Sequence, residues 1–187
     1  MRFFIELSYK GTNYHGWQVQ PNANTVQAEI NKALNTILNA KIELMGAGRT
    51  DAGVHAKQMY AHFDYNTSFD APKLIMKLNS FLKNDIAIHA IFPVDADAHC
   101  RFDAISRVYK YNIVQSKSAF ADDAYFVHKK LDVTAMNMAC DYFLGKQDFT
   151  SFSKANTQTF TNDCTIVFAE WKQENDVLVF TIKADRF

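Results

Sequence analysis

The sequence has no excess of charge of either sign and no long apolar run. Its twenty basic and twenty acidic side chains give a formal net charge of zero at pH 7. Non-specific affinity for nucleic acid comes from neutralising phosphates, so this balance argues against a protein that coats nucleic acid indiscriminately. It does not exclude a locally basic groove. No apolar segment approaches membrane-spanning length, so no membrane partner is expected.

Cysteine is scarce. The three cysteines, Cys100, Cys140 and Cys164, are far apart and show no metal-ligand spacing. An odd, sparse set of thiols is typical of a reducing compartment. Residues 1–5 lead directly into a strand pattern, without the apolar stretch and cleavage site of a signal peptide. The expected location is the cytoplasm.

Motifs of several catalytic classes are also missing. The chain has no Gly-Lys-Ser/Thr phosphate loop and no Gly-x-Ser-x-Gly nucleophile elbow. Its 187 residues are 48% hydrophobic and 14% aromatic, which is typical of a folded globular protein. This length fits one large domain or two small ones.

Hydrophobic periodicity predicts two halves with a similar order of elements. Strand patterns cover residues 2–9, 42–47, 58–65, 86–93, 108–115, 164–172 and 177–184. Helical patterns cover residues 25–38, 70–82 and 133–144. The second helix is expected to turn four side chains inward: Leu74, Ile75, Leu78 and Phe81. Residues 173–176 are predicted to form a hairpin turn. We therefore predict an α+β fold of two similar α/β subdomains, residues 1–105 and 106–187, with a cleft between them.

The most informative segment is the run GAGRTDAGVHA at residues 46–56. Glycine allows positive φ and lets a bulky ligand approach the backbone. A carboxylate in such a segment, here Asp51, is presented to a ligand rather than packed away. With the adjacent guanidinium of Arg49, it suits a nucleophile or base that acts on a substrate carrying anionic groups. The alternative is a tight turn with an Arg–Asp surface pair.

A metal-dependent hydrolase is a further alternative. Asp51, His55 and His62 are all competent metal ligands, although their spacing matches no familiar ligand set. A two-carboxylate glycosidase would need a second acid close to Asp51, which the sequence does not identify.

A second segment, residues 99–111, interleaves basic and aromatic side chains. Its basic residues are Arg101, Arg107 and Lys110. Tyr109 and Tyr111 share one strand face, and this combination suits phosphate contacts with base stacking. The alternative is a solvated basic strand with its tyrosines in the core. His99 and Cys100 are assigned to packing.

Together these segments resemble the tRNA pseudouridine synthase A family. The resemblance rests on GAGRTDAGVHA, on HCRFDAISRVYKY (residues 99–111) and on the Tyr-Lys-Gly-x-x-Tyr-x-Gly-Trp-Gln pattern at residues 9–18. Further matches are residues 25–27, Asn79 with residues 85–86, and residues 145–152. The resemblance extends from Tyr9 to Phe187, and it is highly specific.

The resemblance implies an enzyme that isomerises uridines in the tRNA anticodon stem-loop without a metal or a cofactor. It implies a homodimer whose chains each carry two α/β subdomains, with mostly antiparallel sheets that flank a central RNA-binding cleft. Asp51 matches the catalytic aspartate, which either attacks the ribose C1′ or removes a C2′ proton. The target base must leave the stack first, at a cost of about a few kcal/mol.

Three further residues match family positions that contact the substrate. Arg49 would occupy the space that the base vacates or grip a phosphate, and Tyr109 would stack on the flipped base and shuttle its proton. Arg101 would contact RNA. Weaker candidates are Tyr14, Trp17, Gln18 and His55.

The resemblance also predicts a truncation. Residues 182–187 match only the start of the family's last motif, which continues to a Met-Val-Arg whose arginine pairs with the catalytic aspartate. A smaller departure is Leu82-Lys83, where the family has Leu-Pro. We expect this chain to be a C-terminally truncated member. The alternative is an RNA-binding fragment without catalysis.

Overall fold

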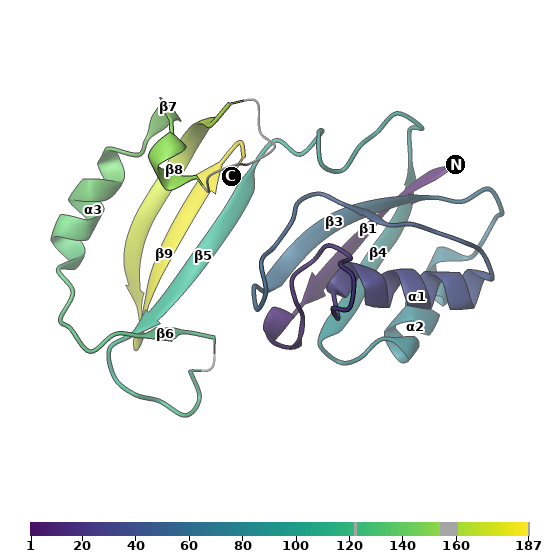
Figure 1. Ribbon diagram of the computed structural model, residues 1–187, viewed down its shortest axis with the longest axis horizontal. Helices are drawn as coiled ribbons and strands as arrows, with labels where there is room; N and C mark the ends of the chain where they lie inside the picture. The colour runs from purple at the N-terminus through teal and green to yellow at the C-terminus, as the bar shows by residue number, and fades with distance from the viewer. Residues whose placement is uncertain (122, 154–160, 187) are drawn as a thin grey trace. The chain divides into compact units, whose positions relative to one another are not determined.

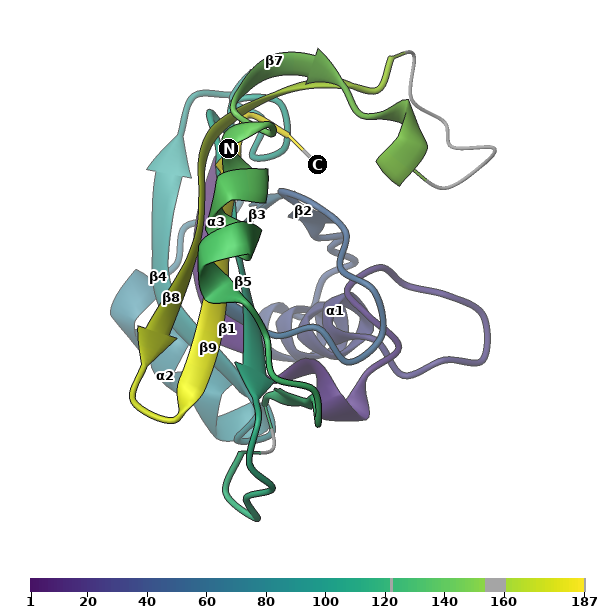
Figure 2. The same ribbon diagram turned by 90° about the vertical axis from the view of Figure 1, so that its left-hand side faces the viewer.

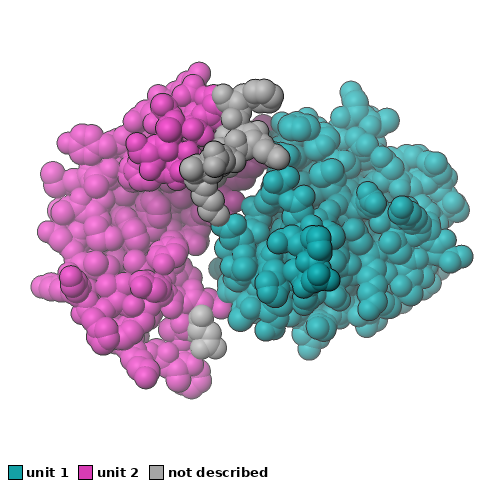
Figure 3. Space-filling view, in the orientation of Figure 1, with its two compact units in different colours: residues 1–104 teal, residues 105–187 magenta. Residues whose placement is uncertain are grey.

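The computed structural model describes residues 1–121, 123–153 and 161–186. The chain divides into two compact units, residues 1–104 and 105–187, which are coloured separately in Figure 3. The described residues contain three α-helices and two mostly antiparallel sheets. The α+β prediction is therefore confirmed. No helix within the described ranges is long and apolar enough to cross a membrane.

The first unit is built on a four-stranded antiparallel sheet with the order β2-β3-β1-β4. Its strands are β1 (Arg2–Tyr9), β2 (Met45–Gly46), β3 (Ala56–Asp64) and β4 (Ile86–Val94). Every second side chain of β1 is buried, from Phe3 to Tyr9. This alternation gives the sheet one apolar face.

Helices α1 (Val26–Leu38) and α2 (Ala71–Phe81) cover that face (Figure 1). Each begins at a side-chain cap: Thr25 accepts a hydrogen bond from the N–H of Ala28, and Asp70 accepts one from the N–H of Lys73.

The prediction that Phe81 points inward is wrong, because its side chain is 44% exposed. Leu74 and Leu78 are buried as expected, but the apolar row continues four residues later to Leu82, which is also buried. Residues four apart lie on one helix face, so Phe81 is turned away from the core.

The predicted strand at residues 42–47 is only partly formed. Ile42 and Leu44 are buried, but their N–H groups donate to the side-chain oxygens of Asn35 and Asn31 on α1, at 2.6 and 2.9 Å. Only Met45–Gly46 pairs with β3. Helix side chains have replaced a neighbouring strand as the hydrogen-bond partners of this segment.

The second unit is a five-stranded sheet with the order β6-β5-β9-β8-β7, in which only the β5–β6 pair is parallel. Its strands are β5 (Arg107–Val114), β6 (Tyr125–Phe126), β7 (Gly145–Asp148), β8 (Asp163–Glu174) and β9 (Val177–Ala184). The hairpin turn between β8 and β9 is Asn175–Asp176, with Asn175 at φ 54°. The predicted hairpin is confirmed.

Helix α3 (Val133–Asp141) lies against β8 (Figure 2), where the side chain of Asn137 bonds both the N–H and the carbonyl of Trp171. It is shorter than the predicted 133–144, because residues 142–144 continue as tighter turns that bond three residues back. The short strands β6 and β7 were not predicted from the sequence.

Candidate active site

Residues 46–56 form the connection between β2 and β3, and both Arg49 and Asp51 are exposed on it. The chain turns immediately after Asp51: the N–H of Val54 donates to the carbonyl of Asp51 at 3.3 Å, and Gly53 adopts a φ of 81°. The loop thus presents a carboxylate and a guanidinium two residues apart.

Thr50, between these two residues, is held by hydrogen bonds to two buried residues. Its hydroxyl lies 2.8 Å from the hydroxyl of Tyr9, a buried residue at the end of β1. Its carbonyl accepts a hydrogen bond from the N–H of Trp17 at 3.2 Å. Bonds on both the side chain and the backbone of Thr50 fix the residue immediately before Asp51. A site held in this way is preorganised.

The loop at residues 10–20 supports the other side of the turn. The N–H of Gly53 donates to the carbonyl of Tyr14, and the N–H of Gly11 donates to Nδ1 of His55 at 2.8 Å. The Tyr14 hydroxyl donates to Asp85 at 2.7 Å, and burial together with this bond raises the pKa of Tyr14 above its ordinary value.

These contacts give supporting roles to several of the weaker candidates. Tyr14 and Trp17 are buried beneath the loop, and His55 is bonded to the backbone through Nδ1. Gln18 is exposed.

Three glycines allow the two loops to meet. A Cβ at Gly46 would lie 2.3 Å from Nε1 of Trp17, and one at Gly16 would lie 2.2 Å from the Thr50 carbonyl oxygen. At Gly11 it would lie 2.0 Å from the Val54 carbonyl oxygen. Gly46 therefore makes room for the protein itself, not for a ligand as its place in the motif had indicated.

Gly48 and Gly53 differ from these three. A Cβ at either position would meet no described atom within 4 Å. These two glycines lie on either side of Asp51 in the chain, so the backbone around the carboxylate is open to a bulky ligand.

The structure does not assemble the metal site drawn from Asp51, His55 and His62. His62 lies seven residues beyond His55 along β3, a separation of roughly 20 Å in an extended strand. Within the described residues, the ligand atoms that come together belong instead to His62, His99 and Cys100. The hydrolase hypothesis built on the first set is wrong.

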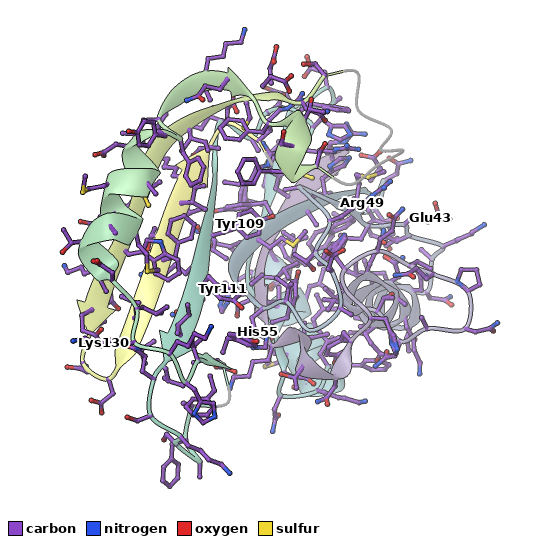
Figure 4. The ribbon with its side chains drawn as sticks, turned by 60° about the vertical axis from the view of Figure 1, so that its left-hand side comes forward. Glu43, Arg49, His55, Tyr109, Tyr111 and Lys130 are labelled. Atoms are coloured by element: carbon purple, nitrogen blue, oxygen red, sulfur yellow. The ribbon has the colours of Figure 1, made fainter. Side chains whose placement is uncertain are left out.

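The second segment is divided between the two units. Arg101 belongs to the first unit, where it is exposed and its guanidinium lies 5.7 Å from the centre of the Phe102 ring. Tyr109 and Tyr111 belong to the second unit, on one face of β5 (Figure 4), and are 41% and 51% exposed. The alternative that placed both tyrosines in the core is therefore wrong.

Of the predicted site residues, Arg49 and Asp51 share one loop, Arg101 lies elsewhere in the same unit, and Tyr109 lies in the other. Sequence reasoning missed the pair formed by Tyr9 and Thr50. The available signal was Tyr9 itself, which ends an alternating apolar face with a side chain that carries a hydroxyl and needs a partner when buried.

Comparisons with known proteins give a consistent result. A family model described as tRNA pseudouridine synthase matches residues 7–103. The chain is 50% identical over 188 residues to tRNA pseudouridine synthase A of Parabacteroides distasonis, covering 100% of this chain and 75% of the relative. It is 50% identical over 189 residues to the protein of the same name in Bacteroides fragilis, with the same coverage. The corresponding protein of Aliivibrio salmonicida is 37% identical over 190 residues, covering 100% of this chain and 72% of the relative.

Proposed function

Because the chain belongs to the tRNA pseudouridine synthase family, whose members are isomerases that modify tRNA, we propose that it converts uridine to pseudouridine in the anticodon stem-loop, with Asp51 as the catalytic group. The observation that carries this proposal is the setting of Asp51. It is exposed, it follows a residue bonded to Tyr9 and Trp17, and it lies between two glycines open to a ligand.

The reaction breaks the bond between uracil N1 and ribose C1′ and makes a bond between uracil C5 and C1′. In one route a carboxylate oxygen of Asp51 attacks C1′ as N1 leaves with the bonding electrons. In the other, Asp51 removes the C2′ proton as N1 leaves. In both, the freed uracil turns and C5 bonds to C1′. In the first route this displaces the carboxylate of Asp51 from C1′, and in the second C2′ takes back the proton that Asp51 had removed. C5 then loses its proton, and N1 gains one.

The neighbouring residues have complementary roles in this proposal. Arg49 holds a phosphate or fills the space that the flipped base leaves, as a guanidinium on the same loop can. Tyr109 stacks on the base, and its half-exposed ring on β5 supports that role. Arg101 contacts the RNA backbone.

Release of tritium from tRNA labelled at uridine C5 tests the proposal, because C5 gives up its hydrogen only when it bonds to C1′. We compare the chain with Asp51→Asn, which keeps the side-chain shape. A control is Asp176→Asn, at an exposed carboxylate in the β8–β9 turn. We expect release to fall by about 10²–10⁴-fold or more in Asp51→Asn and to be unchanged in the control.

Equal release from wild type and Asp51→Asn would contradict the proposal. If neither releases tritium while both bind tRNA, the chain is the RNA-binding module considered as the alternative. Substituting deuterium at C2′ separates the two routes, since only removal of the C2′ proton gives a primary isotope effect.

The proposed working form is a homodimer, which the family resemblance supports. Light scattering of the purified chain tests this directly. A mass equal to one chain at the concentrations used in the release assay would overturn it.

A further inference from the structure

Away from the Asp51 loop, three potential metal ligands meet at the far end of β3. His62, His99 and Cys100 each place a donor atom within 4.8 Å of the donors of the other two. His62 and Cys100 are buried, at 6% and 3% exposure, while His99 is partly exposed and gives access from solvent. We propose that these three residues bind a zinc-class divalent cation, which ties residues 98–103 to β3.

Two of the three donors, on His62 and Cys100, are already in contact. Nδ1 of His62 lies 3.1 Å from the sulfur of Cys100, and it accepts the N–H of Cys100 at 3.4 Å. The lone pair of this nitrogen is therefore directed toward Cys100. A tetrahedral zinc ion with bonds of about 2.0–2.3 Å separates its nitrogen and sulfur ligands by roughly 3.5 Å. The pair needs to open by only a few tenths of an ångström.

The third donor is a ring nitrogen of His99. The His99 ring meets the His62 ring edge-on, with centroids 4.6 Å apart. Around the sulfur, the carbonyl oxygen of Met45 lies at 3.1 Å and is a candidate for a fourth ligand. Two imidazoles and a thiolate are a donor set that suits zinc, and it excludes magnesium and calcium, which prefer oxygen.

A positive charge close to this cluster, that of Arg2, is offset by a carboxylate. Arg2 donates to the carbonyl of Ala98 at 3.0 Å, so its guanidinium is close to the cluster and would oppose a cation. However, it forms a two-point ion pair with Asp64, at 2.8 and 2.9 Å. The carboxylate offsets the positive charge on the side of β3 from which His62 projects.

An ion here would replace weak contacts with coordinate bonds. The hydrogen bond at 3.4 Å is long, and thiols are weak donors and acceptors. The segment that gains rigidity carries Arg101, and its own turn is closed by the His99 N–H, which donates to Asp103 at 2.6 Å. The cluster involves none of the residues assigned to catalysis, so the inference does not depend on the proposed function.

Cobalt(II) titration tests the site, because a cobalt–thiolate bond gives a charge-transfer absorption band. In the wild-type chain we expect such a band to saturate at one ion per chain. We expect Cys100→Ser to abolish it. The double variant Cys140→Ser/Cys164→Ser, in which Cys100 is the sole cysteine, should keep it.

His99→Ala is a second variant for the same titration, at a position that is only partly buried. Removal of a ligand should weaken cobalt binding at least about tenfold, since even outer partners of metal ligands contribute that much. Zinc should raise the Tm of the wild type and leave that of Cys100→Ser unchanged. Circular dichroism confirms that each variant is folded.

Three results would overturn the inference: no charge-transfer band in the wild type, a band that persists in Cys100→Ser, or cobalt affinity unchanged in His99→Ala. None of these readouts involves tRNA, so failure here is distinguishable from failure of the tritium-release assay.

Discussion

Gly46 and Gly48 lie two residues apart in the Asp51 loop, yet a methyl group added to each meets different surroundings. At Gly46 it would lie 2.3 Å from the buried, rigid indole of Trp17, whereas at Gly48 it would meet no described atom within 4 Å. We expect Gly46→Ala to cost about 1–3 kcal/mol of unfolding free energy, as overpacked sites do. We expect Gly48→Ala to change it by less than about 0.5 kcal/mol. Urea denaturation followed by circular dichroism measures both, and equal effects would show that Trp17 gives way easily.

At this residue scale the sequence indicated the candidate residues of the loop, but not the contacts that hold the loop in place. The motif drew attention to Asp51 and Arg49 because their side chains are unusual among small residues. The bond between Tyr9 and Thr50 joins positions far apart in the chain, and no spacing rule connects them. The motif indicated in general that its glycines let a ligand approach. Local sequence does not show that the distant side chain of Trp17 lies against Gly46.

Among the elements, the loop at residues 10–20 is held by the hydrogen bond from Tyr14 to Asp85. The raised pKa of Tyr14 means that the folded protein keeps this proton at a pH where the unfolded chain, with a tyrosine pKa of about 10, has lost it. The stabilisation is therefore complete below pH 10 and declines as the pH rises above 10. We expect Tyr14→Phe to cost about 1.5–3 kcal/mol at pH 8.

The same variant predicts a difference in alkaline sensitivity. Between pH 10 and pH 11, the wild type should lose more unfolding free energy than Tyr14→Phe, because only the wild type has this group to titrate. Tyr142→Phe, at an exposed ring, is the control and should follow the wild type. Parallel pH profiles for wild type and Tyr14→Phe would contradict the assignment.

The sequence predicted the elements in which apolar residues recur at regular spacing. It did not predict those whose structure depends on contacts with distant parts of the chain. The alternation from Phe3 to Tyr9 and the four-residue spacing of Leu74 and Leu78 follow from burial on one face. Strands β6 and β7 are too short to show an alternation of apolar and polar residues, and all four residues of β7 are exposed. The 42–47 segment has the burial pattern of a strand, but asparagine side chains on α1 take the place of a neighbouring strand.

In the whole molecule, the two units differ in how much apolar surface they bury. The first has a connected core that includes both helices and β1, β3 and β4. In the described part of the second, the connected cluster of buried residues is only Cys164, Ile166 and Ala184. Each fully buried aliphatic side chain contributes about 1.5–3 kcal/mol. We therefore expect residues 105–187 to unfold at a lower urea concentration than residues 1–104.

The two tryptophans make this prediction measurable, because each unit holds one. Trp17 is 2% exposed in the first unit, and Trp171 stacks on Phe180 in the second, with ring centroids 4.8 Å apart. In Trp171→Phe the tryptophan fluorescence comes from Trp17 alone. Subtracting it from the fluorescence of the wild type gives the contribution of Trp171. We expect the Trp171 transition at the lower urea midpoint. A single coincident transition would show instead that the units unfold cooperatively, and that contacts beyond each unit's own core set the stability of the second.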